Sequence, residues 1–233
     1  MPGCHFPGAV ISHAVWLYLR FPLRFRNVEE LLAERGIHVS YETVRRWVAR
    51  FGPYYTLELR KREARPGKTW HLDEMAVRIA GKQHWLWRAV DENGTTLDVL
   101  LQEHRDTDAA ERFFRMLLGH AGGAPERITT DMLGSYAAAI RRLPELASVE
   151  HLQVRSAMRC NNRVEQAHQP TRIRERRMGR FRSPSSAQRF LCAFGRVSNL
   201  FRPRRHLLTA VQYHATLQDR FATWRMVAGL PAA

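Results

Sequence analysis

The 233-residue chain has few cysteines and no long hydrophobic run. Its cysteines, Cys4, Cys160 and Cys192, lie far apart and form no CxxC pair, so the sequence predicts neither a disulfide scaffold nor a zinc site. No apolar stretch approaches the ~18 residues that a membrane-spanning helix needs. The most apolar early segment, 8–19, is interrupted by His13 and follows no Lys or Arg, which makes it a poor signal peptide. We therefore expect a cytoplasmic protein without a membrane partner.

Acidic residues are also scarce, since 22 Asp and Glu stand against 37 Lys and Arg, for a formal net charge of +15. A surface of that charge attracts polyanions, so nucleic acid is the expected partner. Segment 155–205 contains fourteen arginines and only two acids, and it holds most of the excess. Because arginine binds phosphate through paired hydrogen bonds, this segment is expected to follow a phosphate backbone rather than to form only a solvated helix face.

The first 60 residues have the periodicity of helices joined by a turn. Asn27 is expected to cap one helix, with Glu30 three residues on, and Gly36 to follow its end. Ser40 is expected to cap the next helix, and Gly52-Pro53 to end it. The polar face of this second helix is formed by Glu42, Arg45, Arg46, Ala49 and Arg50. The pattern fits a helix-turn-helix that reads a major groove, although an ordinary helical hairpin has the same periodicity.

After residue 68 the period changes from helical to alternating. Three strands are expected, over 69–79, 82–90 and about 95–102, with a turn signal at 91–94. Two helices and two short strands then alternate, at 106–120, 127–130, 135–142 and 149–154, before a helical segment from 161 that breaks near 183–184. This order predicts an α/β protein with a mixed sheet flanked by helices.

These patterns divide the chain into four parts. We expect a small all-α helix-turn-helix domain over 1–60, a linker over 61–68, an α/β domain over 69–205 and a C-terminal helical tail over 206–233. The tail has a mixed pattern, which fits either a dimerisation helix or a cap on the core.

Three carboxylates occupy unusual positions. Asp73 shares a face of its predicted strand with apolar residues, where an unpaired charge is costly. Asp131 ends the short strand 127–130, at a carboxyl end where α/β folds bind ligands. Glu165 is one of two acids in the arginine-rich segment. Three acids on three elements can hold two Mg²⁺ ions for phosphodiester chemistry, although each acid alone also fits an ion pair or a helix-terminal role.

The residues around these acids resemble the DDE transposases of bacterial insertion sequences, most closely the insertion-sequence-six family. The resembling segments are 70–74 (WHLDE), 88–91 (RAVD), 130–131 (TD) followed by Tyr136, and 161–165 (NNRVE). The 34 positions from Asp131 to Glu165 also match, as does Arg172 seven positions later. One departure is Met132, because many relatives have Lys there.

The resemblance implies a ribonuclease H-like core in which Asp73, Asp131 and Glu165 bind two Mg²⁺ ions, with Mn²⁺ as a substitute. It implies cleavage of DNA at terminal inverted repeats and strand transfer into target DNA, by a homo-oligomer of at least two subunits at the bacterial nucleoid. The expected DNA contacts are Glu42, Arg45, Arg46, Arg50, Arg163 and Arg172. Two alternatives stay open: a helix-turn-helix regulator without catalysis, and a ribonuclease H-like nuclease that cuts without joining.

Overall fold

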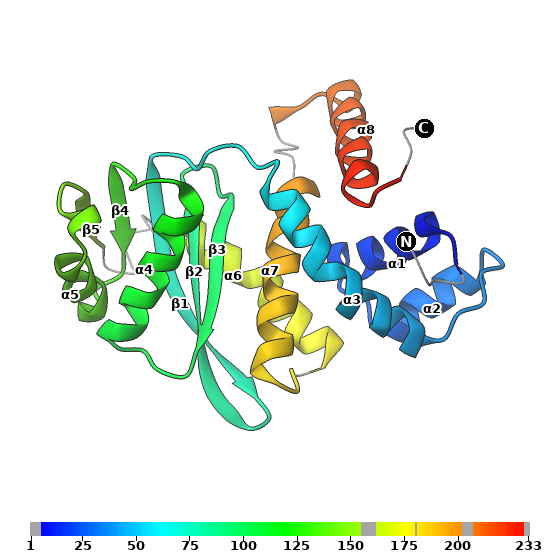
Figure 1. Ribbon diagram of the computed structural model, residues 1–233, viewed down its shortest axis with the longest axis horizontal. Helices are drawn as coiled ribbons and strands as arrows, with labels where there is room; N and C mark the ends of the chain where they lie inside the picture. The colour runs from blue at the N-terminus through cyan, green and yellow to red at the C-terminus, as the bar shows by residue number, and fades with distance from the viewer. Residues whose placement is uncertain (1–5, 155–161, 180, 202–206, 231–233) are drawn as a thin grey trace. The chain divides into compact units, whose positions relative to one another are not determined.

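The computed structural model describes residues 6–154, 162–179, 181–201 and 207–230, except the side chains of residues 162–167 (Figure 1). The chain forms two compact units. One unit comprises Ala64–Leu191, and the other combines Met1–Glu63 with Cys192–Ala233. Within the described part of the chain, no helix combines the length and hydrophobicity that spanning a bilayer requires.

The unit Ala64–Leu191 is built on a five-stranded sheet with the order β3-β2-β1-β4-β5. Strands β1 (Thr69–Ile79), β2 (Lys82–Asp91) and β3 (Thr96–Gln102) form an antiparallel meander, and β4 (Arg127–Thr130) and β5 (Glu150–Gln153) join β1 in parallel. These strands agree with those predicted from the alternating segments and the turn signal at 91–94. The result confirms the predicted mixed sheet.

Helices cover both faces of this sheet, as Figure 1 shows. Helix α4 (Thr107–Ala121) begins where the Asp106 side chain accepts the amide of Ala109, and it ends at Gly122, whose φ is 72°. Helix α5 (Gly134–Arg142) packs against α4, and a 3₁₀ turn, η1 (Pro144–Leu146), follows it. Helix α6 (Asn162–Met178) contacts β1 and β2, and α7 (Pro184–Phe201) comes after it.

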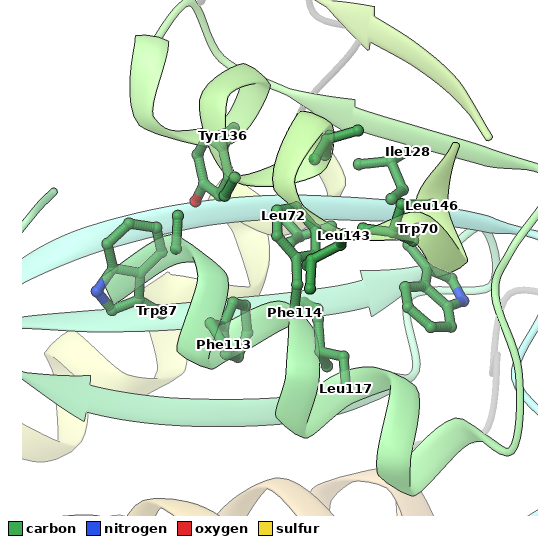
Figure 2. Packing of buried hydrophobic residues seen from close by; sticks show 14 of the residues in the cluster. Trp70, Leu72, Trp87, Phe113, Phe114, Leu117, Ile128, Tyr136, Leu143 and Leu146 are labelled. Carbon is green, nitrogen blue, oxygen red and sulfur yellow. The ribbon is translucent and has the colours of Figure 1, made fainter. Parts of the chain in front are cut away.

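The main core lies between the sheet and helices α4 and α5, as Figure 2 shows. Its largest fully buried side chains are Trp70, Trp87, Phe113, Phe114 and Tyr136. The ring centroids of Trp87 and Tyr136 lie 5.3 Å apart in an edge-to-face arrangement. This packing fixes α5 on β1 and β2, and so fixes the end of β4 from which α5 departs.

The β3 edge of the sheet is closed by a side chain from α7. Gln188 accepts the amide of Leu101 at 2.7 Å through Oε1 and donates through Nε2 to the carbonyl of Val99 at 2.8 Å. The amide side chain thus takes the place of a neighbouring strand. An edge closed in this way is a poor template for pairing with another chain.

Gly67, just before β1, has no room for a side chain. A Cβ there would lie 2.2 Å from Oε2 of Glu92, whose carboxylate accepts the amides of Lys68 and Thr69. Gly67→Ala is therefore expected to displace Glu92 and to destabilise this unit by about 1–2 kcal/mol, measured by urea unfolding. The matched control is Gly119→Ala in α4, where a Cβ meets nothing within 4 Å. That variant is expected to be neutral or to stabilise by up to about 1 kcal/mol, and equal effects of both would contradict the assignment.

The other unit is helical. It contains α1 (Gly8–Arg20), α2 (Phe25–Ala33), α3 (Tyr41–Arg60) and α8 (Ala210–Val227). Ser40 caps α3 as predicted, since its Oγ accepts the amide of Thr43 at 3.2 Å. The prediction that Asn27 caps α2 was wrong. The helix begins at Phe25 with Arg24 as its N-cap, three residues earlier than predicted, and the Asn27 side chain reaches back to accept the amide of Arg24 at 3.0 Å.

The prediction that Gly52-Pro53 ends the second helix was also wrong, because α3 continues through Pro53 to Arg60. Proline removes one helical hydrogen bond. The bond that is lost is the one to the carbonyl of Ala49, four residues before Pro53, and in the next turn the hydroxyl of Thr56 donates to the carbonyl of Gly52 at 2.8 Å. Burial of Tyr55 and Leu59 beyond the proline offsets the cost of the break.

Helix α8 packs within the helical unit. Trp224 lies 5.0 Å from Tyr55 of α3 between ring centroids, and Phe221 lies 5.2 Å from Trp16 of α1. The C-terminal helix therefore covers the apolar sides of α1 and α3.

Candidate active site

Two of the three predicted acids meet beside the carboxyl end of β4. Asp131 directly follows β4, and Asp73 lies in the middle of β1, two residues past the last pair that β1 forms with β4. In this parallel pair His71 lies opposite Thr129, and continuing the register by two residues brings Asp73 level with Asp131. Carboxylate oxygens of Asp73, Asp131 and the neighbouring Glu74 all lie within 4.8 Å of one another. The side chains of Asp73 and Asp131 are 19% and 24% exposed, so both can reach a ligand from solvent.

Glu74 lies on the opposite face of β1 from Asp73, among the core residues, and its side chain is fully buried. The hydroxyl of Tyr136 donates to Oε2 at 2.7 Å, and Nε of Arg105 donates to Oε1 at 2.5 Å. Burial raises the pKa of Glu74, and the hydrogen bond from Tyr136 opposes that shift. Burial, together with the Glu74 charge, raises the pKa of Tyr136 well above its ordinary value, so this hydroxyl stays protonated and donates.

The Asp131 carboxylate is oriented from two sides. Its Oδ1 accepts the amide of Leu133 at 2.9 Å, which turns the chain from β4 into α5. Its Oδ2 lies 3.6 Å from Nη2 of Arg105. Asp131 therefore holds the turn that leads into α5 without capping that helix, and its partly exposed side chain can bind a ligand.

Helix α6 crosses the sheet beside Asp73. Buried His168 of α6 brings its Nε2 to 3.4 Å from Oδ2 of Asp73, and burial lowers the pKa of His168 while the contact with Asp73 opposes that shift. Arg88, directly across from Asp73 on β2, donates to the hydroxyl of Thr171 at 2.7 Å. Glu165 lies on α6 one turn before His168, and its side chain is outside the described residues, as is that of Arg163.

The predicted DNA contacts on α3 form a linked group at the start of the helix. Glu42 accepts Nε of Arg45 at 2.8 Å and lies 3.4 Å from Nε of Arg46. The hydrogen bond from Arg45 lowers the pKa of Glu42 to about 2. Arg50 lies one turn further on, with its guanidinium 5.4 Å from the ring centroid of Phe51. Arg172 is exposed on α6.

Carboxylate oxygens gathered in this way are the kind of hard-oxygen donor that Mg²⁺ takes in metal-dependent phosphoryl transfer. A family model described as a DDE domain matches residues 67–204. The transposase for insertion sequence-like element IS431mec of Staphylococcus aureus is 31% identical over 203 residues, covering 87% of this chain and 89% of that protein. The transposase for IS257 in transposon Tn4003, from the same species, is 30% identical over the same shares. The catalytic domain of Mos1 mariner transposase gives a TM-score of 0.44 at 14% identity, covering 77% of this chain and 91% of that chain.

The chain belongs to the DDE transposases of insertion sequences, in the insertion-sequence-six family. These enzymes are polynucleotidyl transferases that act on DNA and use divalent metal ions. The family assignment also argues against one of the two alternatives, a DNA-binding regulator without catalysis.

Sequence reasoning assigned no site role to three of these side chains, Glu74, Arg105 and Tyr136, although Glu74 and Tyr136 stand among the residues that carry the family resemblance. The signal for Glu74 was present, since it alternates with Trp70 and Leu72 along β1 and so shares their face toward the core. Arg105 lies in the loop between β3 and α4, where no periodicity indicates direction.

Proposed function

We propose that Asp73, Asp131 and Glu165 together bind two Mg²⁺ ions, or Mn²⁺ as a substitute, for cleavage and joining of DNA. The observation that carries this is the meeting of Asp73 and Asp131 beside the end of β4, with partly exposed hard-oxygen donors. When bound, two such ions stabilise charge on the attacking and leaving oxygens of an in-line displacement at phosphorus. The protein itself supplies position, and no covalent nucleophile is needed.

The place of Glu165 in this site is supported by α6. Positions 165, 168 and 172 follow one face of a helix by their spacing. His168, in the middle of that series, contacts Asp73. Because α6 brings His168 to Asp73, position 165 lies one helical turn from the residue that contacts Asp73. Glu165 is therefore the third acid of the proposal.

The DNA roles follow the charge. Arg172 and Arg163 on the arginine-rich α6 are proposed to hold phosphates near the transferred end. Glu42, Arg45, Arg46 and Arg50 on α3 are proposed to read the terminal inverted repeat. Cleaving two ends and joining them to target DNA needs at least two subunits, and the substrate locates the enzyme at the bacterial nucleoid.

The test is a strand-transfer assay with a labelled terminal-repeat duplex and a supercoiled plasmid, in Mg²⁺, in Mn²⁺ and in EDTA. We expect label joined to plasmid only when the metal is present. Cleavage without joining would identify the alternative nuclease, and binding without either reaction would identify the alternative regulator.

Arg46→Ala is expected to weaken binding to the terminal repeat roughly tenfold while binding to unrelated duplex changes less, because a base contact carries about 1–3 kcal/mol of discrimination. Arg46 is 74% exposed at the start of α3 and is available to DNA. Arg35→Ala is the matched control, since Arg35 is 65% exposed in the same unit but precedes α3. Fluorescence anisotropy measures both, and equal losses for the two variants would refute the recognition role of α3.

A further inference from the structure

The buried acid of the cluster, Glu74, has its oxygens committed within the protein. Tyr136 donates to Oε2 and Arg105 to Oε1, and the side chain has no exposed surface. Asp73 and Asp131, by contrast, both reach solvent, where an ion shared with a DNA phosphate has to lie. Glu74 is thus near the site but faces away from the place where substrate enters.

Arg105 is the residue that links this buried acid to the exposed one. Its Nε and Nη2 both contact Oε1 of Glu74, and the same Nη2 lies 3.6 Å from Oδ2 of Asp131. Its guanidinium stacks 4.9 Å from the ring centroid of Trp85. Three neighbours therefore fix a long side chain that would otherwise move freely in the loop between β3 and α4.

We infer that Arg105 positions Asp131, and that Glu74 and Tyr136 anchor Arg105 rather than ligate metal. The amide of Leu133 orients Oδ1 of Asp131, and Arg105 orients Oδ2, so the carboxylate is held from both sides. Partners of this kind fix the direction of a ligand's lone pairs before the ion arrives. A lysine has one ammonium in place of the planar fork and cannot make these contacts together. The inference rests on the proposed function, because it takes Asp131 to be a metal ligand.

The experiment uses the full chain and measures Mn²⁺ binding by electron paramagnetic resonance without DNA, strand transfer at saturating Mn²⁺, and the melting temperature. Loss of a residue that orients a ligand costs about 10–100-fold in affinity or activity. We therefore expect Arg105→Gln to weaken Mn²⁺ binding and to slow joining by about tenfold each, and Arg105→Lys to restore only part of this. Glu74→Gln keeps an oxygen for Arg105, so its Mn²⁺ affinity should stay within about threefold of wild type.

Two reference variants separate the possible outcomes. Arg115→Gln is the matched control for charge, since Arg115 is an exposed residue of α4 paired with Glu111. Asp131→Asn tests the proposed function on its own, and wild-type Mn²⁺ binding in that variant would remove Asp131 from the metal site.

If Asp131→Asn is inactive, the proposed function stands, and three results would still overturn the positioning role of Arg105. Arg105→Gln could match wild type in Mn²⁺ affinity and joining. It could instead lower only the melting temperature, which would show a structural role. Finally, Glu74→Gln could lose Mn²⁺ binding as completely as Asp131→Asn, which would make Glu74 a ligand.

Discussion

Asp73→Asn and Asp131→Asn are each expected to lower the rate of cleavage and joining by at least ~10³-fold, about 4 kcal/mol of transition-state stabilisation. Asparagine keeps the size of the side chain but removes the charge that neutralises a divalent cation. Because the two carboxylates lie within 4.8 Å of each other and both supply charge to the same place, neither can take over for the other. Binding of terminal-repeat DNA in EDTA should change little, since α3 is not altered. Quantifying labelled joined product and anisotropy in parallel checks both statements.

The control for these variants is Asp108→Asn. Asp108 lies on α4 in the same unit, is 70% exposed and pairs with Arg142 on the surface. It should keep wild-type joining, because an exposed ion pair contributes at most ~1 kcal/mol to stability. Under the proposed function, Glu165→Gln is expected to lose activity as Asp73→Asn and Asp131→Asn do. If any one of the three acid variants joins DNA at the wild-type rate, that residue is not part of the site.

The strands of this protein could be predicted from the sequence because local patterns of residues determine them. Residues 69–79 and 127–130 were expected as strands and form β1 and β4 with those bounds, because alternation and turn residues act within a few positions. The helix ends were less certain. Pro53 carries a strong local signal for a break, yet burial of Tyr55 and Leu59 further along α3 outweighs it. That burial depends on residues from α8, which no local pattern contains.

The candidate site, too, could be predicted only in part from the sequence. Asp73 and Asp131 were singled out from their places on strands, and the parallel register of β1 and β4 then brings them together. The sequence pattern placed Asp73 on a face with apolar residues and assigned no role to Glu74. In the structure both faces of β1 are covered by helices, and it is Glu74 that is fully buried. The partners Arg105 and Tyr136 come from 31 and 62 positions away, so only the folded chain reveals them.

Trp87→Ala is expected to destabilise the unit Ala64–Leu191 by about 3–5 kcal/mol, because it empties the centre of the core. The Trp87 side chain is fully buried, and its ring packs on those of Tyr136 and Phe113. Loss of that ring also releases Tyr136, which donates to Glu74 beside the two acids. Joining activity should therefore fall at least as far as the folded fraction, because Tyr136 is one of the residues inferred to anchor Arg105. Urea unfolding followed by far-ultraviolet circular dichroism measures the stability.

The matched control is the same substitution two residues earlier. Trp85 lies on the same strand but is only half-buried at the border of the core, so Trp85→Ala removes less buried apolar area and should cost about 1–2 kcal/mol. The difference in unfolding free energy between the two variants separates the cost of the cavity from the cost of losing any tryptophan. If Trp87→Ala costs no more than Trp85→Ala, the packing between the sheet and α5 does not hold the site in place, and Tyr136 must be fixed by its hydrogen bond to Glu74 alone.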